Sequence, residues 1–313
     1  MATPTIYKSS DAGAPYLTTE QAYTVLKECL VTGYGAKAGA GWTLAFDDPV
    51  NKKAVFKNVH GDCALRVDAS TNATYSTIQV ADDFSDIDTP IGALWHGAAL
   101  LSVGNYTTST DRPWILFATD EFFIFYANNT ASLTATTAAA ASSTIFIMFG
   151  RASPLGDNTV ENVIFATAGN NAFGGAIGFF ALAATVFTQT FTQKDYLGGT
   201  TGARSATFYT GMVQRYESSP GVYSTGSYPG TAGPAAPSVS KVPGEKWTAF
   251  REDGSCVGYT PVFVPYFRLD PTTQGLTIDD TMVIDGVTYS ILNMYNANTT
   301  SSFARFLVPH DGW

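Results

Sequence analysis

The sequence predicts a mainly β protein, made of β-sandwich or meander-type domains, with one N-terminal α-helix over about residues 18–32. Short apolar runs recur roughly every ten residues between polar turns, a spacing typical of all-β folds. Aromatic residues make up 13% of the 313 residues and charged residues only 14%, a composition that favours strands over long amphipathic helices. One segment near the N-terminus has a clear helical period.

The predicted helix is identified by its end signals and its apolar face. Thr18 is placed to cap its N-terminus, with Gln21 as the capping-box partner three residues later. Gly33 and Gly35 are placed to end it, because either can adopt the left-handed conformation that closes many helices. The apolar face follows the i, i+3, i+4, i+7, i+8 spacing and consists of Ala22, Val25, Leu26, Cys29 and Leu30.

Two hairpins are predicted from apolar runs. The arms of the first are residues 114–118 and 121–126, and both are apolar on both faces, which indicates a place in the middle of a sheet or under another layer. The arms of the second are residues 281–284 and 287–292. They are joined by Asp285-Gly286, a pair typical of tight two-residue hairpin turns.

The chain is predicted to form two subdomains, over residues 1–150 and 151–313. A Pro/Gly-rich segment at 220–244 has little apolar content, so we expect a linker or a surface arm that orders against a neighbour. Residues 260–269 form an apolar run that contains Pro261 and Pro265. Because proline cannot donate to a strand ladder, this run predicts an edge strand.

Charge and apolar patterning exclude several partners. The chain has 17 basic and 26 acidic residues and a formal net charge of −9, so no nucleic-acid partner is expected. The longest apolar stretch, residues 173–187, is interrupted by glycines and is shorter than the roughly 20 residues that cross a bilayer. The N-terminal residues lack the basic and apolar regions of a signal peptide. Phosphate-loop and nucleophile-elbow motifs are also missing, so we expect no cofactor and no enzymatic activity.

One acidic stretch holds the candidate metal ligands Asp82, Asp83, Asp86 and Asp88, since spaced carboxylates suit a hard cation such as calcium. The stretch has no central glycine and no terminal glutamate at the EF-hand spacing, so a solvated turn is the favoured interpretation. The cysteines have no metal-ligand spacing either and are predicted to be buried as small apolar side chains. They are Cys29, Cys63 and Cys256.

Several short patterns occur in a distinctive order between residues 8 and 160. They are Asp11–Pro15, Cys29–Thr43, Ala54–Lys57, Leu65–Asp68, Asp86–Thr89, Arg112–Ile115, Asp120 with Phe122–Tyr126, and Phe149–Ser153 with Gly156 and Asp157. In this order they resemble a family of virion structural proteins encoded by tailed bacteriophages and prophages. The stretch from Asp11 to Thr43 is the most specific part of the resemblance.

The resemblance implies a role in assembly, and it brings no catalytic residues with it. We therefore expect a structural component on the exterior of the virion, as a head decoration or in the neck, tail or baseplate, assembled in the host cytoplasm. Its partners would be copies of itself, in a homo-oligomer, and other virion proteins. Residues expected to serve structure or interfaces are Tyr34, Trp42, Arg112, Trp114, Asp120 and Trp313. Arg112 and Asp120 are expected to pair across the first hairpin.

Two alternatives stay open. The first is a glycan-binding or adhesion module of the tail, which would use exposed aromatic side chains for stacking on sugars. The second is a tail-associated cell-wall hydrolase, which would need two carboxyl groups held about 5 to 10 Å apart in one cleft.

Overall fold

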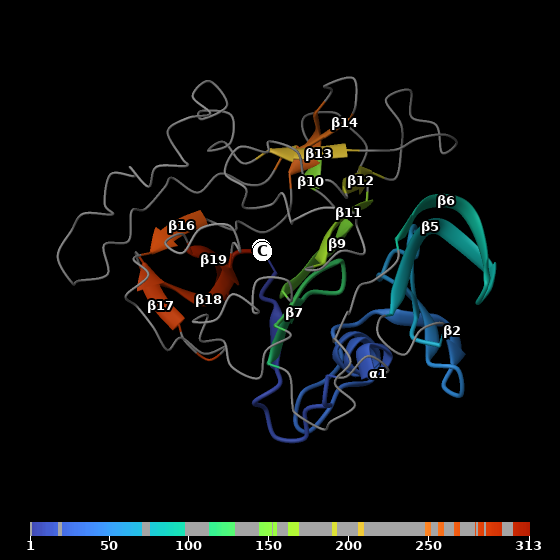
Figure 1. Ribbon diagram of the computed structural model, residues 1–313, viewed down its shortest axis with the longest axis horizontal. Coiled ribbons are helices and arrows are strands. Elements are labelled where there is room, and N and C mark those ends of the chain that lie inside the picture. The colour runs from blue at the N-terminus through green and yellow to red at the C-terminus, as the bar shows by residue number, and fades with distance from the viewer. Residues whose placement is uncertain are drawn as a thin grey trace.

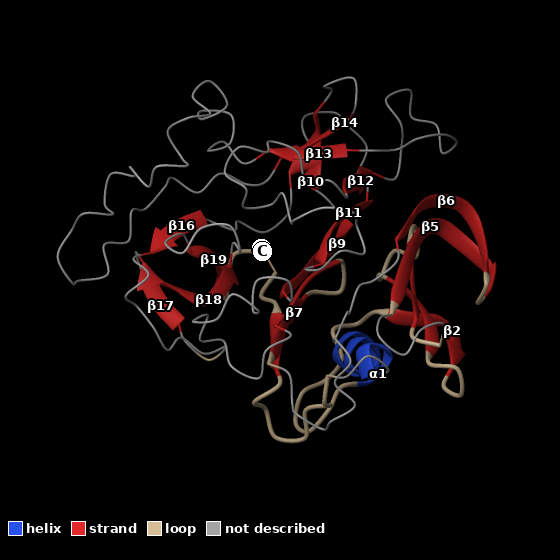
Figure 2. Ribbon diagram, viewed as in Figure 1, coloured by secondary structure: helices blue, strands red, loops and turns tan. Residues whose placement is uncertain are grey.

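The computed structural model is mainly β, as the sequence predicts, and the described residues hold one short helical segment (Figure 2). Every strand pair among these residues is antiparallel. The segments at 173–187 and 220–244 lie outside the described part of the chain. The structure describes residues 2–17, 21–70, 76–97, 113–128, 144–151, 153–154, 162–168, 190–192, 206–209, 248–251, 256–259, 266–269, 279, 281–284, 286–295 and 303–313.

The helical segment ends where the sequence predicts, but its last turn is wider than an α-helix. Helix α1 (Gln21–Lys27) continues as the π-helical turn η1 (Glu28–Thr32), and Thr18 lies outside the described residues. Gly33 closes the segment at a φ of 80°, with its N–H bonded to the carbonyl of Glu28. The carbonyls of Cys29 and Leu30 instead accept the N–H groups of Ala40 and Trp42, so the returning loop completes this helix end.

A six-stranded central sheet has the order β1-β7-β8-β9-β11-β12. Its strands are β1 (Thr5–Lys8), β7 (Trp114–Ala118), β8 (Phe122–Asn128), β9 (Thr144–Arg151), β11 (Asn162–Ala168) and β12 (Thr190–Thr192). The sheet therefore takes strands from both sides of residue 150. The division into subdomains stays a prediction.

Three smaller sheets complete the described fold. The N-terminal sheet, in chain order, comprises β2 (Thr43–Asp48), β3 (Lys53–Lys57), β4 (Ala64–Asp68), β5 (Thr77–Asp86) and β6 (Thr89–Gly97). The C-terminal sheet has the order β16 (Tyr266–Leu269), β19 (Phe303–Pro309), β18 (Val287–Tyr295) and β17 (Thr281–Ile284). The fourth sheet has the order β10 (Ser153–Pro154), β15 (Cys256–Tyr259), β14 (Thr248–Arg251) and β13 (Ala206–Tyr209).

The central sheet is covered on both faces (Figure 1). Alternate residues of β7 and β8, such as Trp114 and Phe123, share one core with the helical segment and the N-terminal sheet. On the opposite face, the Phe117 ring lies 6.2 Å from that of Trp313 and 6.3 Å from that of His310. The ring of Phe122 lies 6.3 Å from that of Trp313. Both faces of the β7–β8 hairpin are therefore withdrawn from water.

Both predicted hairpins are confirmed. Strands β7 and β8 pair from Trp114 opposite Ala127 to Ala118 opposite Phe123, and every described side chain of these strands is buried. Strands β17 and β18 pair with Ile284 opposite Val287, which leaves a two-residue turn. Strand β16 lies at a sheet edge, as the prolines before it predict.

Gly150 and Gly61 offer a direct test of how tightly the first hairpin is packed. Gly150 has a φ of 139°, and a Cβ there would clash with the carbonyl oxygen of Glu121 and lie 2.6 Å from Cα of Phe122. Gly61 has a φ of 66° with open space around it. We expect Gly150→Ala to lower the free energy of unfolding by about 2 to 5 kcal/mol, from backbone strain and overpacking together. Gly61→Ala should cost about 1 kcal/mol from strain alone.

Urea denaturation of the two variants, followed by tryptophan fluorescence, measures this difference. Equal losses for the two substitutions would contradict the close approach of β9 to the hairpin turn.

Candidate functional site

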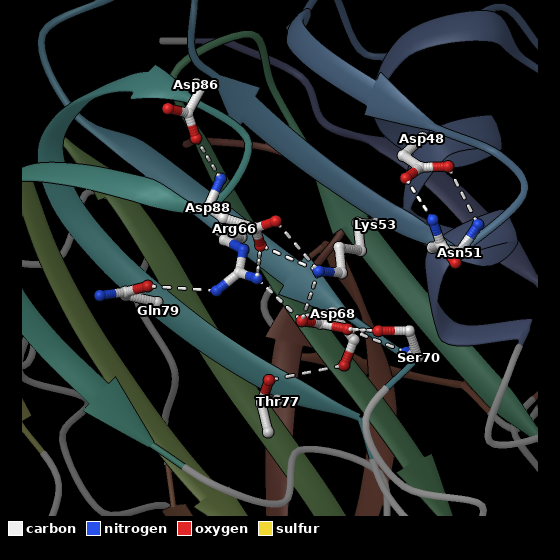
Figure 3. Close-up of polar contacts among 10 residues, drawn as sticks. All are labelled: Asp48, Asn51, Lys53, Arg66, Asp68, Ser70, Thr77, Gln79, Asp86 and Asp88. Carbon is white, nitrogen blue, oxygen red and sulfur yellow. Dashed lines mark hydrogen bonds and ion pairs between the residues drawn. The ribbon is translucent and has the colours of Figure 1, made fainter.

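The two faces of the N-terminal sheet differ in chemistry. Residues on one face, including Phe56 and Leu65, join the main core. The cross-strand pair Val55 and Arg66 lies on the opposite face, because neighbouring residues of a strand point to opposite sides. Arg66 is also directly opposite Gln79 of β5. This second face carries a group of polar side chains that contact one another (Figure 3).

Arg66 is the centre of this polar cluster (Figure 3). Its Nη2 donates to Oδ2 of Asp68 at 2.8 Å and also to Oδ1 of Asp88. Its Nη1 lies 3.4 Å from Oε1 of Gln79. The ammonium of Lys53 lies 2.9 Å from Oδ1 of Asp88 and 3.6 Å from Oδ2 of Asp68. Two cations thus bind the same two carboxylates.

The cluster is buried at one end and open at the other. The side chain of Asp68 is 3% exposed, whereas that of Asp88 is 54% exposed. Oδ1 of Asp68 also accepts the N–H and the hydroxyl of Ser70, so both of its oxygens are satisfied. The hydrogen bond from Lys53 to Asp88 raises the pKa of the Lys53 ammonium above its usual value, so this ammonium stays charged. Nε of Arg66 is buried without a hydrogen-bond partner.

The cluster holds a curved hairpin in place. Asp88 lies in the turn between β5 and β6, whereas Lys53 and Arg66 lie on β3 and β4. The ladder of β5 and β6 has irregularities between Val80 and Ala81 and between Phe84 and Asp86. Such irregularities bend strands. The ion pairs therefore join the tip of this hairpin to the second face of the N-terminal sheet.

Three of the four candidate metal ligands bind different groups, and the carboxylate of the fourth, Asp82, lies against Gly92. Asp83 binds Lys57 at 2.6 Å, and that hydrogen bond lowers the pKa of its carboxyl. Asp86 accepts the N–H of Asp88 at 2.8 Å, and the Asp88 carboxylate binds Arg66 and Lys53. A Cβ added at Gly92 would clash with the carboxylate of Asp82. In the part of the chain that the structure describes, no three His, Cys, Asp or Glu side chains are grouped to hold a metal ion.

Four of the predicted structural residues lie in a second centre around the loop after η1: Tyr34, Trp42, Trp114 and Asp120. Trp42 donates to the carbonyl of Thr119 at 2.8 Å, and Trp114 donates to that of Pro15 at 3.1 Å. The Tyr34 ring lies 6.2 Å from that of Trp114. The backbone of Asp120 accepts the N–H of Val59. Arg112, and with it the expected Arg112–Asp120 pair, lies outside the described residues.

Asp11 joins the first strand to this loop. One of its oxygens accepts the hydroxyl of Tyr34 at 2.7 Å, the ammonium of Lys37 at 2.5 Å and the backbone N–H of Lys8 at 2.7 Å. Burial alone would raise the pKa of the Asp11 carboxyl. The three hydrogen bonds outweigh burial and hold that pKa below its usual value. For Tyr34, burial and the hydrogen bond to Asp11 raise the pKa of the phenol.

Other described groups with reactive side chains have structural partners. His60 contacts Glu121 at 2.7 Å on the surface, and the rings of Trp42 and Trp114 are buried. Cys29 and Cys63 are buried, as predicted, and the thiol of Cys63 donates to the carbonyl of Ala81, while the burial of Cys256 is not described. Trp313 is also buried, and its indole donates to the carbonyl of Pro309. No described helix is long and apolar enough to span a membrane.

Arg66, Asp68 and Lys53 are not among the site residues predicted from the sequence. One signal for them was available, because Arg66 and Asp68 alternate with Leu65 and Val67 in a strand. Two charges on one face of an otherwise apolar strand need partners from neighbouring strands. Which strands supply them depends on the sheet register.

No protein-family model, no curated protein sequence and no solved structure matches this chain. The geometry of the chain itself is therefore the basis for assigning a role to these two centres.

The polar cluster makes a prediction about stability. Arg66→Met leaves the buried carboxylate of Asp68 with the more distant Lys53 as its remaining cation, so the free energy of unfolding should fall by about 3 kcal/mol. Asp88→Asn should cost about 1 kcal/mol or less, because its carboxylate is half exposed to water. Urea denaturation of both variants measures the difference. A smaller loss for Arg66→Met than for Asp88→Asn would contradict a buried cluster centred on Arg66.

The contacts of Asp11 predict a pH dependence. Because its pKa is lower in the folded chain, Asp11 stabilises the fold above the pKa of an unfolded aspartate, and this contribution is lost as the pH falls through the lowered value. Between about pH 5 and pH 2, the free energy of unfolding of the wild type should therefore fall more steeply than that of Asp11→Asn. Urea titrations at several pH values measure both slopes. Parallel slopes would show that the carboxylate adds no pH-dependent stability.

Proposed function

We propose that this chain is a structural component on the exterior of a tailed-phage virion, where it acts by non-covalent assembly. The proposal combines the resemblance of residues 8–160 to virion structural proteins with the positions of the residues that carry it.

The single observation that carries the proposal is that the resembling patterns contact one another. Asp11 binds Tyr34 and Lys37, which joins the first pattern to the second. Strand β3 pairs with β4 in register, which joins Ala54–Lys57 to Leu65–Asp68. These patterns lie far apart in the sequence but contact one another in the folded chain. Such contacts support a resemblance that goes beyond chance similarity of short runs.

The described residues of the remaining patterns join the same unit. Arg66 binds Asp88 in the next pattern. The rings of Trp42 and Phe123 lie 5.4 Å apart, and those of Phe123 and Phe149 lie 6.1 Å apart. These residues build and hold the fold, which supports a scaffold role over a catalytic one.

Assembly is also supported over the two alternatives. A sugar-binding surface uses exposed aromatic rings, whereas the rings of Trp42, Trp114 and Trp313 are buried and Tyr16 is the exposed aromatic side chain among the described residues. A glycosidase needs a carboxyl pair that is free to act on substrate. The close pair Asp68 and Asp88 is bound by Arg66 and Lys53.

Quantitative mass spectrometry of purified particles tests the proposal. The particles come from the phage or induced prophage whose genome encodes this chain. We expect the chain at a fixed ratio to the major capsid protein, retained through a high-salt wash, and labelled on intact particles by a membrane-impermeant amine reagent. A replication enzyme from the same genome is the control for carry-over. Absence from washed particles, or labelling only after particle disruption, would contradict the proposal.

A further inference from the structure

The edge strands of the described sheets differ in how they are protected from pairing with another chain. The unpaired N–H and C=O groups of an edge invite another strand, and proteins block them with prolines, charges, bulges or their own side chains. The carbonyl of Ile6 in β1 is occupied by Lys37. Strand β6 contains Pro90 and lies in an irregular ladder. Strand β2 carries Asp47, and β16 carries Arg268.

Strand β17 is short, but within the described residues it has no charge, proline or bulge to protect it. Its four residues, Thr281–Ile284, include no charge and no proline, and its ladder with β18 is regular. No described strand pairs with its outer side. The side chain of Val283 is 66% exposed. An exposed apolar residue on an unprotected edge marks a site for strand addition.

The hairpin register identifies the backbone groups that are available. Beside a two-residue turn, Ile284 and Val287 form a hydrogen-bonded pair, and hydrogen-bonded pairs alternate along an antiparallel ladder. Met282 therefore also points its backbone groups at β18. Thr281 and Val283 point theirs to the outside, where an added strand can bind them.

The charges around β17 favour one kind of partner. Asp279 and Asp280 precede the strand, and Asp285 follows it in the sequence. The side chain of Asp279 is 51% exposed, although Lys8 at 3.1 Å offsets its charge in part. A strand with basic residues at both ends of an apolar centre complements this pattern, since opposite charges across strands stabilise pairing.

A second copy of the chain fits this edge less well. In the antiparallel frame that pairs Thr281 of one copy with Val283 of the other, Asp279 lies opposite Asp285 of the second copy. Like charges in directly opposite positions destabilise strand pairing. Self-pairing through β17 in this frame is therefore disfavoured.

We propose that the outer edge of β17 binds an extended, basic-flanked segment of a neighbouring virion protein, which adds to the C-terminal sheet as a fifth strand. This inference rests on the proposed function for the source of the partner. The edge itself can be tested on the isolated chain.

A fluorescent peptide provides the test. The probe has alternating threonine and valine with two lysines at each end, and a matched peptide has glutamates in place of the lysines. The lysine peptide should bind the full chain, measured by fluorescence anisotropy, and the glutamate peptide should not. Val283→Pro removes an outward N–H without removing a bond to β18, so it should weaken binding at least about tenfold. Val283→Thr keeps that N–H and is the matched control.

Circular dichroism first establishes that each variant is folded. If Val283→Pro does not fold, Val283→Lys takes its place, because it keeps the backbone and repels the lysine peptide. Equal binding of both peptides, unchanged binding by folded Val283→Pro or Val283→Lys, or dimerisation of the wild type that Val283→Lys abolishes would overturn the proposal. Absence of the chain from virions would contradict the proposed function and leave the peptide result standing. Normal incorporation of Val283→Lys into particles would contradict the edge proposal alone.

Discussion

The β7–β8 hairpin is apolar on both faces, and the rest of the described fold depends on covering it twice. One cover consists of the helical segment and the N-terminal sheet, which share a core with Trp114 and Phe123. The other includes His310 and Trp313, which lie against Phe117. A strand pair of this composition is stable in water only between two layers, because each exposed face would add a large apolar area to the surface.

Described polar groups near these layers hold neighbouring elements in position through hydrogen bonds and ion pairs. Asp68 and Asp11 have similar partners, since each binds a lysine from another element together with hydroxyl and backbone donors. A buried carboxylate is tolerated when it is paired and fully hydrogen-bonded. In this chain Asp88 joins a curved hairpin to its sheet, and Asp11 joins the first strand to a loop. Both arrangements suit a protein whose surface has to keep a constant shape.

Much of the described fold follows from local sequence. The period of apolar residues predicts the hairpin at 114–126, and the pair Asp285-Gly286 predicts the one at 281–292, because both depend only on near neighbours along the chain. The end of the helical segment follows from Gly33. The π-helical turn does not, because its geometry depends on Ala40 and Trp42 bonding the carbonyls that an α-helix would leave free.

The two polar centres could be predicted only in part. Tyr34 is singled out by the resemblance, but its bond to Asp11 joins residues 23 positions apart and depends on how the first strand packs. Arg66 meets Asp88 because the β5–β6 ladder is irregular and curved, and nothing in the spacing of those residues encodes the curvature. Sequence periodicity specifies which face a residue takes, whereas the partner on that face is set by register and bending.

The second cover of the hairpin has a consequence for synthesis. Phe117 and Phe122 leave the ribosome long before His310 and Trp313. One aromatic face of the β7–β8 hairpin therefore stays uncovered until the C-terminal residues are synthesised. During that interval the face is a ready binding surface for a chaperone or for another nascent copy. Folding factors, and the spacing of ribosomes on the message, thereby influence how much of the chain folds properly.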